Sequence, residues 1–375
     1  MTGMHNRLGS FVALIVVLLA GPIARAGGES TGWKPDEAGQ YLDERQKVWF
    51  AFSSASRGKG ATRTTCVSCH SVLGYALARP VLRKLVGVSA PTEQEKQLLD
   101  QTRKRVANWK RLDTEAFGLL YDFSDRKKQE SLGTEAVLNT VILALDDRYQ
   151  GRSSPSVVTK QAFSNLWATQ RQAGDHQGTW DWLDFNLGPW EVREARYFGA
   201  ALAAIAVGTA PGYYTPGADA ATDARVKLLQ GYLKAGLPRQ NLHNRAWGLW
   251  AATKVEGILS KAERKKLVDQ LLDRQREDGG WSLPALGRWV RSDGTAQETA
   301  SDGYATGLVL HVLQTAGVPK DDAKVTKGLD WLRHHQSATG AWRGVSVNKQ
   351  RDPTSHAGKF MSDAATAYAV LALGH

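Results

Sequence analysis

The stretch "KGLDWLRHHQSATGAW", residues 327–342, has related copies elsewhere in this chain. An earlier segment, "LLDRQREDGGW" at 271–281, repeats its second half, and the Gln, Gly and Trp of that segment each lie 61 residues before their counterparts. A looser copy, "LWATQRQAGDHQGTW", occupies residues 166–180. Repeats of this length indicate supersecondary units that stack on one another or close into a ring.

The segments between the Gly and Pro breaks carry apolar residues at three- and four-residue spacing, which predicts helices, and strand-like alternation is nowhere sustained. Helices with one charged side are predicted near 35–50, 92–110, 156–172, 219–235, 260–276 and 321–336. Helices rich in Ala, Gly and Leu, and therefore suited to burial on all sides, are predicted to begin near 69, 131, 194, 241, 298 and 361. Six outer and inner helices in alternation predict an all-α fold, a closed (α/α)6 toroid, with an open superhelix as the alternative.

The repeat is similar to the QW repeat of triterpene cyclases: a basic residue, Gly, an aromatic residue with Leu, then Gln and Gly-x-Trp. Over residues 35–375 the chain resembles the squalene–hopene cyclase and prenyltransferase toroid superfamily, which implies a single α/α toroid. The resemblance implies little about chemistry, because function depends on sites built onto a fold. Cyclases of this superfamily that protonate an alkene carry an Asp-x-Asp-Asp run, whereas Asp302 and Asp363 each stand alone here and are expected to cap helices.

The first 26 residues have the features of a secretory signal peptide: Arg7, the apolar run "FVALIVVLLAG" and the small-residue site "ARA". The run is too short to span a bilayer, and no later stretch is long and apolar enough to do so. We therefore expect a toroid domain at 27–375 that is secreted or periplasmic. The net charge of +11 comes from scattered Lys and Arg without interleaved aromatics, which argues against nucleic acid and suggests solvated helix faces.

Both cysteines lie in "TTCVSCHSVLGYALARP", residues 64–80, where Cys66, Cys69 and His70 form a Cys-x-x-Cys-His motif at the expected start of the first inner helix. This motif is the attachment signal of haem c, because both thiols form thioethers to the porphyrin and the adjacent histidine is the proximal iron ligand. The same three side chains are also possible ligands of Zn. A disulfide between Cys66 and Cys69 is the third interpretation, and it would close only a small loop.

A sixth iron ligand is predicted from the closure of the ring. Met361 stands at the start of the last inner helix, which is next to the first in a closed ring, so we expect Met361 near His70. His243 and His356 are weaker candidates for the same role. Aromatic residues near the starts of the inner helices are candidates for lining an apolar pocket: Tyr75, Tyr197, Trp247, Tyr304 and Tyr368.

The sequence thus predicts an exported c-type haem toroid that works in electron transfer or haem-based redox chemistry. Its expected partners are a redox protein or an apolar isoprenoid- or quinone-like molecule. The alternative is a non-haem toroid that binds or transforms an isoprenoid, with zinc at Cys66, Cys69 and His70.

Overall fold

The computed structural model describes residues 32–112, 114 and 117–375. The predicted signal peptide, residues 1–26, therefore lies outside the described residues. Within the described ranges, none of the helices has the length and apolar character needed to cross a membrane.

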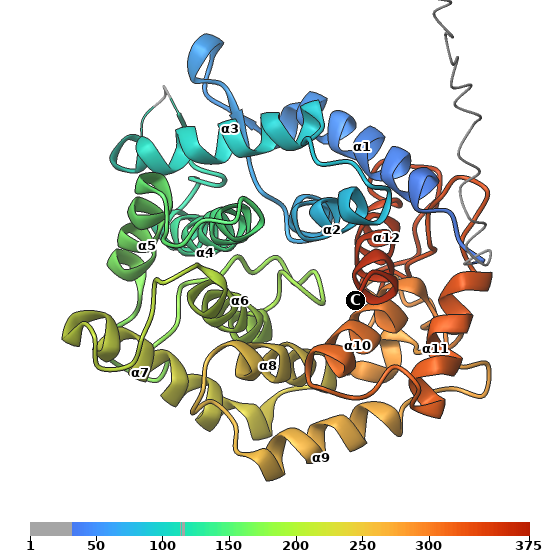
Figure 1. Ribbon diagram of the computed structural model, residues 1–375. Coiled ribbons are helices and arrows are strands. Elements are labelled where there is room, and N and C mark those ends of the chain that lie inside the picture. Colours follow the sequence, from blue (N-terminus) through green and yellow to red (C-terminus); the bar gives the residue numbers. More distant parts are fainter. Residues whose placement is uncertain (1–31, 113, 115–116) are drawn as a thin grey trace, which may run out of the picture. The chain divides into compact units, whose positions relative to one another are not determined.

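The described residues form a ring of alternating outer and inner helices (Figure 1). The outer helices are α1 (Pro35–Ala51), α3 (Glu93–Ala107), α5 (Val157–Thr169), α7 (Ala220–Gly236), α9 (Lys261–Leu272) and α11 (Ala323–His334). The inner helices are α2 (Val72–Leu85), α4 (Asp125–Tyr149), α6 (Arg196–Thr209), α8 (Leu242–Lys254), α10 (Gly303–Thr315) and α12 (Phe360–Leu373). Each inner helix packs against the next, and α12 packs against α2, which closes the ring. The predicted (α/α)6 toroid is confirmed, and the open superhelix is excluded.

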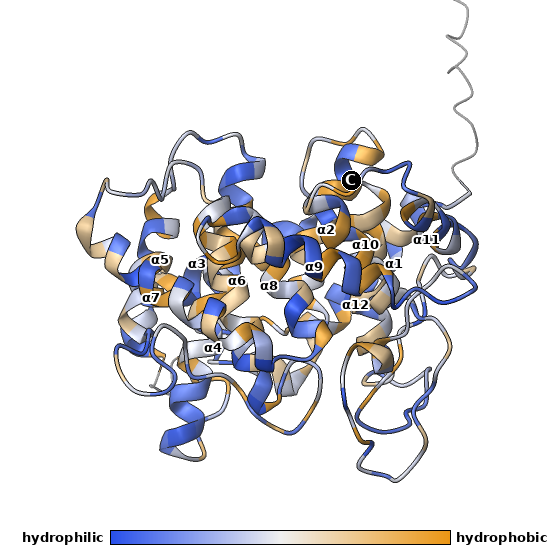
Figure 2. Ribbon diagram, turned by 90° about the horizontal axis from the view of Figure 1, so that it is seen from below, coloured by the Kyte–Doolittle hydropathy of each residue, from blue (hydrophilic) through white to orange (hydrophobic). Residues whose placement is uncertain are grey.

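The two classes of helix differ in polarity as the sequence predicts. Figure 2 shows apolar inner helices behind outer helices that expose polar residues. The inner helices approach closely because they carry small residues: a Cβ on Gly307 of α10 would lie 2.5 Å from the backbone of α12. A short antiparallel hairpin, β1 (Ser56–Arg57) with β2 (Thr64–Thr65), precedes α2.

The glutamine of the repeat connects neighbouring outer helices. Nε2 of Gln275 donates to the carbonyl oxygen of Lys324 in the first turn of α11 at 2.7 Å. Nε2 of Gln336 donates to the carbonyl oxygen of Lys34, the residue before α1, at 3.0 Å. The repeat glycine Gly340 has φ +81°, and a Cβ there would lie 2.3 Å from the backbone of α1. The Gln and Gly of the repeat therefore hold neighbouring outer helices together and have a structural role, not a catalytic one.

The repeat tryptophan fastens each long connection to its own outer helix. Nε1 of Trp281 donates to the carbonyl oxygen of Leu271, and Nε1 of Trp342 donates to that of Leu332, each at 2.8 Å. Both indoles are fully buried. Each therefore satisfies a carbonyl group near the end of a helix while filling the core.

The inner helices all run in one direction, because every outer and inner pair is antiparallel. We call the end of the ring where the inner helices begin face A, and the end where they finish face B. Most of the connections on face A are long, whereas those on face B are short. Two helix starts differ from the expectation. α4 begins at Asp125 and not near 131, because the Ser124 hydroxyl accepts from the Lys127 amide and caps the helix six residues earlier. α10 begins at Gly303 and not near 298, because Asp302 caps it.

Candidate functional site

The Cys-x-x-Cys-His motif lies on face A, between β2 and α2. The Cys66 amide donates to the carbonyl oxygen of Ala55 at 3.0 Å, and its own carbonyl accepts from Nε1 of Trp49 at 2.8 Å. Cys66 is partly exposed and Cys69 is buried, and both are free thiols. Burial raises the pKa of Cys66 to about 12 and that of Cys69 well above its ordinary value. Both groups are therefore neutral thiols in this arrangement.

His70 is held by an aromatic stack and a hydrogen bond. Its ring stacks on Phe360 with centroids 3.9 Å apart, and its Nδ1 lies 2.9 Å from Oγ of Ser71. Burial, with a contribution from His356, lowers the pKa of His70 to about 3, so the imidazole is neutral. A neutral imidazole suits metal binding, but among the described residues no three His, Cys, Asp or Glu side chains converge to hold a metal ion.

Two candidate ligands from the last helix pair, His356 and Met361, precede and follow Phe360 in the sequence. Met361 is buried, and its Cβ and backbone lie against Gly344. Phe360, the residue before Met361, makes a ring contact with His70. His356 packs against Phe360 with ring centroids 4.9 Å apart, and neither of its nitrogens has a hydrogen-bond partner among the described residues.

His243 lies deeper in the ring. It is fully buried, and its Nε2 is 2.9 Å from the hydroxyl of Tyr304, which also accepts from Nε1 of Trp190 at 3.1 Å. Burial lowers the pKa of His243 to about 4. The structure thus places His243 in a buried hydrogen-bond network, in which its two ring nitrogens contact Tyr304 and Asn244.

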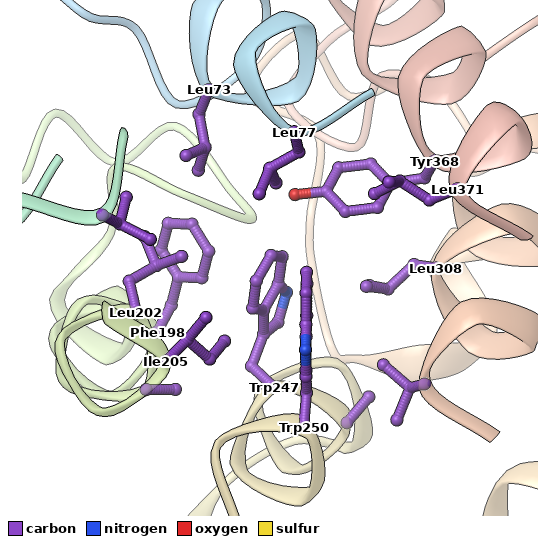
Figure 3. Close-up of a cluster of buried hydrophobic side chains, with 14 of the residues drawn as sticks. Leu73, Leu77, Phe198, Leu202, Ile205, Trp247, Trp250, Leu308, Tyr368 and Leu371 are labelled. Carbon is purple, nitrogen blue, oxygen red and sulfur yellow. The ribbon is translucent and has the colours of Figure 1, made fainter. Parts of the chain in front are cut away.

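The aromatic residues expected to line a pocket divide into two groups. The hydroxyls of Tyr75 and Tyr197 donate away from the centre, to a carboxylate of α1 and a carbonyl of α7. Trp247, Tyr304 and Tyr368 surround the centre of the ring, with centroids of Tyr304 and Tyr368 5.3 Å apart and those of Trp247 and Tyr368 5.8 Å apart. Figure 3 shows Trp247 and Tyr368 among the apolar side chains that fill this central core.

The two single aspartates have different roles. Oδ1 of Asp302 accepts from the amides of Tyr304 and Ala305 at 3.0 Å each, so it caps α10 as expected. Asp363 lies inside α12 and caps nothing. Both of its oxygens instead bind Arg45 of α1, and Oδ2 also accepts from Ser71 at 2.6 Å. The expectation of a cap at Asp363 is wrong, because the start of α12 lies earlier and this carboxylate is needed for ring closure.

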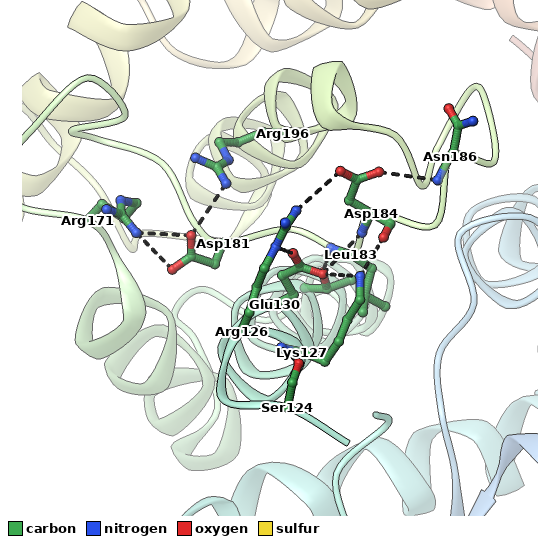
Figure 4. Close-up of polar contacts among 11 residues, drawn as sticks. Ser124, Arg126, Lys127, Glu130, Arg171, Asp181, Leu183, Asp184, Asn186 and Arg196 are labelled. Carbon is green, nitrogen blue, oxygen red and sulfur yellow. Dashed lines mark hydrogen bonds and ion pairs between the residues drawn. The ribbon is translucent and has the colours of Figure 1, made fainter. Parts of the chain in front are cut away.

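A loop at residues 183–192 reaches across face A. Its first part is bound to α4, where Glu130 accepts from Arg126 and Lys127, and Lys127 also donates to the carbonyl of Asp184 (Figure 4). Its tip is bound on the far side of the ring, where Nδ2 of Asn348 donates to the carbonyl of residue 188 at 2.7 Å. The loop is therefore held by hydrogen bonds at its start and at its tip.

Glu191 of this loop is a residue that the sequence reasoning missed. Its carboxylate makes no hydrogen bond or ion pair with any described residue, and its charge acts on both Cys66 and Cys69. Burial raises the pKa of Glu191 to about 7, against a smaller lowering by Lys127. Nothing in the local pattern "GPWEV" marks this residue, because its isolation results from the surrounding fold.

Face B holds a cavity of about 560 Å³ at the centre of the ring. Its apolar wall includes Leu77, Ile205, Trp250 and Leu371, which converge from four inner helices in Figure 3. Five basic side chains line it as well: Arg148, Arg152, Lys254, His311 and His375. No acidic residue is among those that line this cavity.

Most of this basic charge is not neutralised. Arg152 pairs with Asp147 at 3.0 Å. Arg148 and Lys254 form no ion pair with any described residue, and burial lowers the pKa of Lys254. A cavity with uncompensated cations and no carboxylate favours an anionic ligand. The sequence reasoning interpreted the scattered basic residues as solvated faces and did not find this cluster.

A family model described as the squalene-hopene cyclase C-terminal domain matches residues 259–375. No curated protein matches the chain. The unsaturated glucuronyl hydrolase of Bacillus sp. GL1, described as responsible for the degradation of glycosaminoglycan, is a similar solved structure, 12% identical, with a TM-score of 0.50 over 91% of this chain and 96% of its own. A glycosidase variant is 12% identical, with a TM-score of 0.51 over 93% and 99%. The chain is an α/α toroid, and at these identities the likeness to solved structures shows the fold alone.

These findings contradict the function that the sequence predicts. The two similar toroids named above are glycosidases and not electron-transfer proteins, and no group of three metal ligands forms among the described residues. Haem-based electron transfer is therefore wrong, and so is the alternative of an isoprenoid-transforming or zinc-dependent toroid. Haem c at Cys66, Cys69 and His70, with Zn as the alternative, stays a prediction.

Proposed function

We propose that this protein binds an acidic saccharide in the cavity of face B. The observation that carries the proposal is the wall of this cavity: five basic side chains, no acidic side chain and the indole of Trp250 around about 560 Å³. Cavities of roughly 300 to 1,000 Å³ are the usual size for small-molecule sites. The indole of Trp250 adds apolar surface to the wall, while the cations match the carboxylate of an acidic sugar.

The charge of the cavity supports an anion in particular. Arg148 and Lys254 stand on α4 and α8, and neither has a described counter-charge. Burying an ammonium group without a partner is unfavourable, which is why the pKa of Lys254 is lowered. A carboxylate or sulfate in the cavity would supply the missing partner to both cations.

The fold is compatible with a saccharide ligand. One toroid with the same architecture is named for its action on a glucuronyl group, an acidic sugar. The same architecture is therefore compatible with such a ligand. The further step, from compatibility to recognition in this chain, rests on the residues of the cavity.

Binding, and not cleavage, is the activity we assign to this cavity. Hydrolysis of glycosides ordinarily uses two carboxyl groups on either side of the bond. None of the side chains that line the cavity is a carboxylate. The predicted signal peptide places this binding in the periplasm or outside the cell, where polysaccharide fragments are encountered.

Calorimetric titration tests the proposal with a disaccharide that contains glucuronate. The full-length mature protein should bind it, and the methyl ester of the same disaccharide should bind at least about tenfold more weakly, a difference of about 1.4 kcal/mol. Lys254→Met should lose a similar factor. The matched control is Lys261→Met, an exposed lysine at the start of α9. Equal binding of ester and acid, or an equal loss in both variants, would overturn the proposal.

A further inference from the structure

His311 is the most unusual group in the wall of this cavity. It lies on α10, and both of its ring nitrogens are buried without a hydrogen-bond partner among the described residues. Its ring meets the Trp250 ring edge to face with centroids 4.5 Å apart. The backbone carbonyl of Leu371 lies close enough to the imidazole to raise its pKa, as a weak hydrogen-bond acceptor does. A buried imidazole without partners is unfavourable and indicates a position that a ligand completes.

The charged groups around His311 are all basic. Lys254 faces it from α8, and His375 faces it from beyond α12 with ring centroids 6.0 Å away. Arg148 of α4 stands in the same cavity wall. α12 contributes a carbonyl and no charge. No carboxylate side chain among those lining the cavity is therefore available to stabilise a protonated imidazole.

We propose that His311 takes up a proton when the anionic ligand binds, and that it is the residue by which the cavity selects an acidic sugar over a neutral one. This inference rests on the proposed function. The carboxylate of the ligand accepts a hydrogen bond from the new N–H of the imidazolium ring. The proton comes from the solvent, and no covalent bond to the ligand is formed.

The physical reason is a change in the electrostatic partner of His311. Burial, together with the charges of His375 and Lys254, lowers the pKa of the free imidazole to about 3. A carboxylate within hydrogen-bond distance favours the protonated form and raises the pKa again. At a pH between these two values binding and protonation are linked, so affinity rises as the pH falls, by up to about tenfold for each pH unit.

Calorimetry of the mature protein in two buffers with different ionisation enthalpies measures this proton directly. With the glucuronate disaccharide as the probe, we expect an uptake of about one proton near pH 5.5 and almost none near pH 8. Binding without any uptake at pH 5.5 would refute this inference and leave the proposed function intact. Absence of binding at both pH values would refute the proposed function itself.

Variants identify the histidine that is responsible. His311→Gln keeps hydrogen-bonding atoms and cannot take a charge, so it should bind with no uptake and with a flat pH dependence. His334→Gln, at an exposed position of α11, is the matched control and should behave as the wild type. Loss of uptake in His375→Gln instead of His311→Gln would overturn the assignment. NMR of the histidine side chains in the wild-type protein, with and without the disaccharide, gives the same answer if a variant fails to fold.

Discussion

Arg45 of α1 and Asp363 of α12 form a buried two-point ion pair, with Nε–Oδ1 at 2.7 Å and Nη2–Oδ2 at 3.1 Å. The two residues are 318 positions apart and belong to the first and last helix pairs. Ser71 and Tyr41 donate to the same carboxylate, which leaves no unsatisfied oxygen. This network is therefore a polar connection between the two ends of the ring.

Replacing the carboxylate should destabilise the closed ring. Asp363→Asn leaves the guanidinium of Arg45 buried without a counter-charge, and breaking a buried pair in this way costs about 3 to 5 kcal/mol. Denaturant unfolding followed by circular dichroism measures the loss. The exposed pair Arg333–Asp330 provides the control, because Asp330→Asn should change stability by less than about 0.5 kcal/mol. Similar losses in the two variants would contradict a special role for ring closure.

The repeat glutamines should not be equivalent in stability. Gln336 binds the segment before α1 through two hydrogen bonds, so Gln336→Leu should cost about 1 to 3 kcal/mol. Gln46 occupies the matching place in the first repeat, but its Nε2 is buried without a partner. Gln46→Leu should therefore be neutral or stabilising. If urea unfolding shows a larger loss of unfolding free energy for Gln46→Leu than for Gln336→Leu, the stabilising role given to the Gln336 hydrogen bonds is wrong.

Glu191 should make stability depend on pH. Its pKa is about 7 in the folded protein and near 4.5 when unfolded, so the folded state keeps the proton in this range. The free energy of unfolding should fall as pH rises from about 4.5 to 7, by on the order of 1 to 3 kcal/mol from this group. Glu191→Gln should flatten that part of the curve. Glu194→Gln, at an exposed position three residues later, should leave the pH dependence of stability unchanged. An equal effect of the two substitutions would refute a raised pKa that is particular to Glu191.

Trp250 should contribute to ligand binding through its shape. Trp250→Ala removes the indole that packs between Trp247 and His311 in the cavity wall, and we expect the glucuronate disaccharide to bind about tenfold or more weakly. Trp250→Phe keeps an aromatic face and should lose less. The tryptophan fluorescence of the wild type should also change on binding, since the indole lies in the wall. Unchanged affinity in Trp250→Ala would place the ligand elsewhere.

Added salt distinguishes the electrostatic part of the binding. The cations Arg148 and Arg152 are largely exposed, so screening should weaken binding of the acidic disaccharide between about 0.05 and 0.5 M NaCl. The weaker binding of the methyl ester should be nearly independent of salt. Titrations at several salt concentrations test this. A salt-independent affinity for the acid would argue against the basic cluster as its binding partner.

The helices and their alternation were open to sequence reasoning because they depend on local periodicity. The repeat around Gln275 and Gln336 recurs at a fixed interval, and outer and inner helices differ in composition, so the sequence predicts a toroid of alternating helices. The packing of α12 against α2 decided between the closed ring and the open superhelix. The same reasoning misplaced the start of α4, where a charged first segment continues the helix after Ser124. It also gave the conspicuous Cys66, Cys69 and His70 a function that the comparisons contradict.

The functional geometry was decided by the tertiary structure. Arg148, Lys254 and His311 belong to three inner helices, and in the sequence each is an ordinary polar residue near the end of a helix. They meet because ring closure brings the ends of all inner helices to one face. Glu191 is isolated because a loop fixed at both ends buries it. The sequence determined which segments are helical and which sides are apolar, since those follow from neighbouring residues, whereas the charge of the cavity arose only from distant segments brought together.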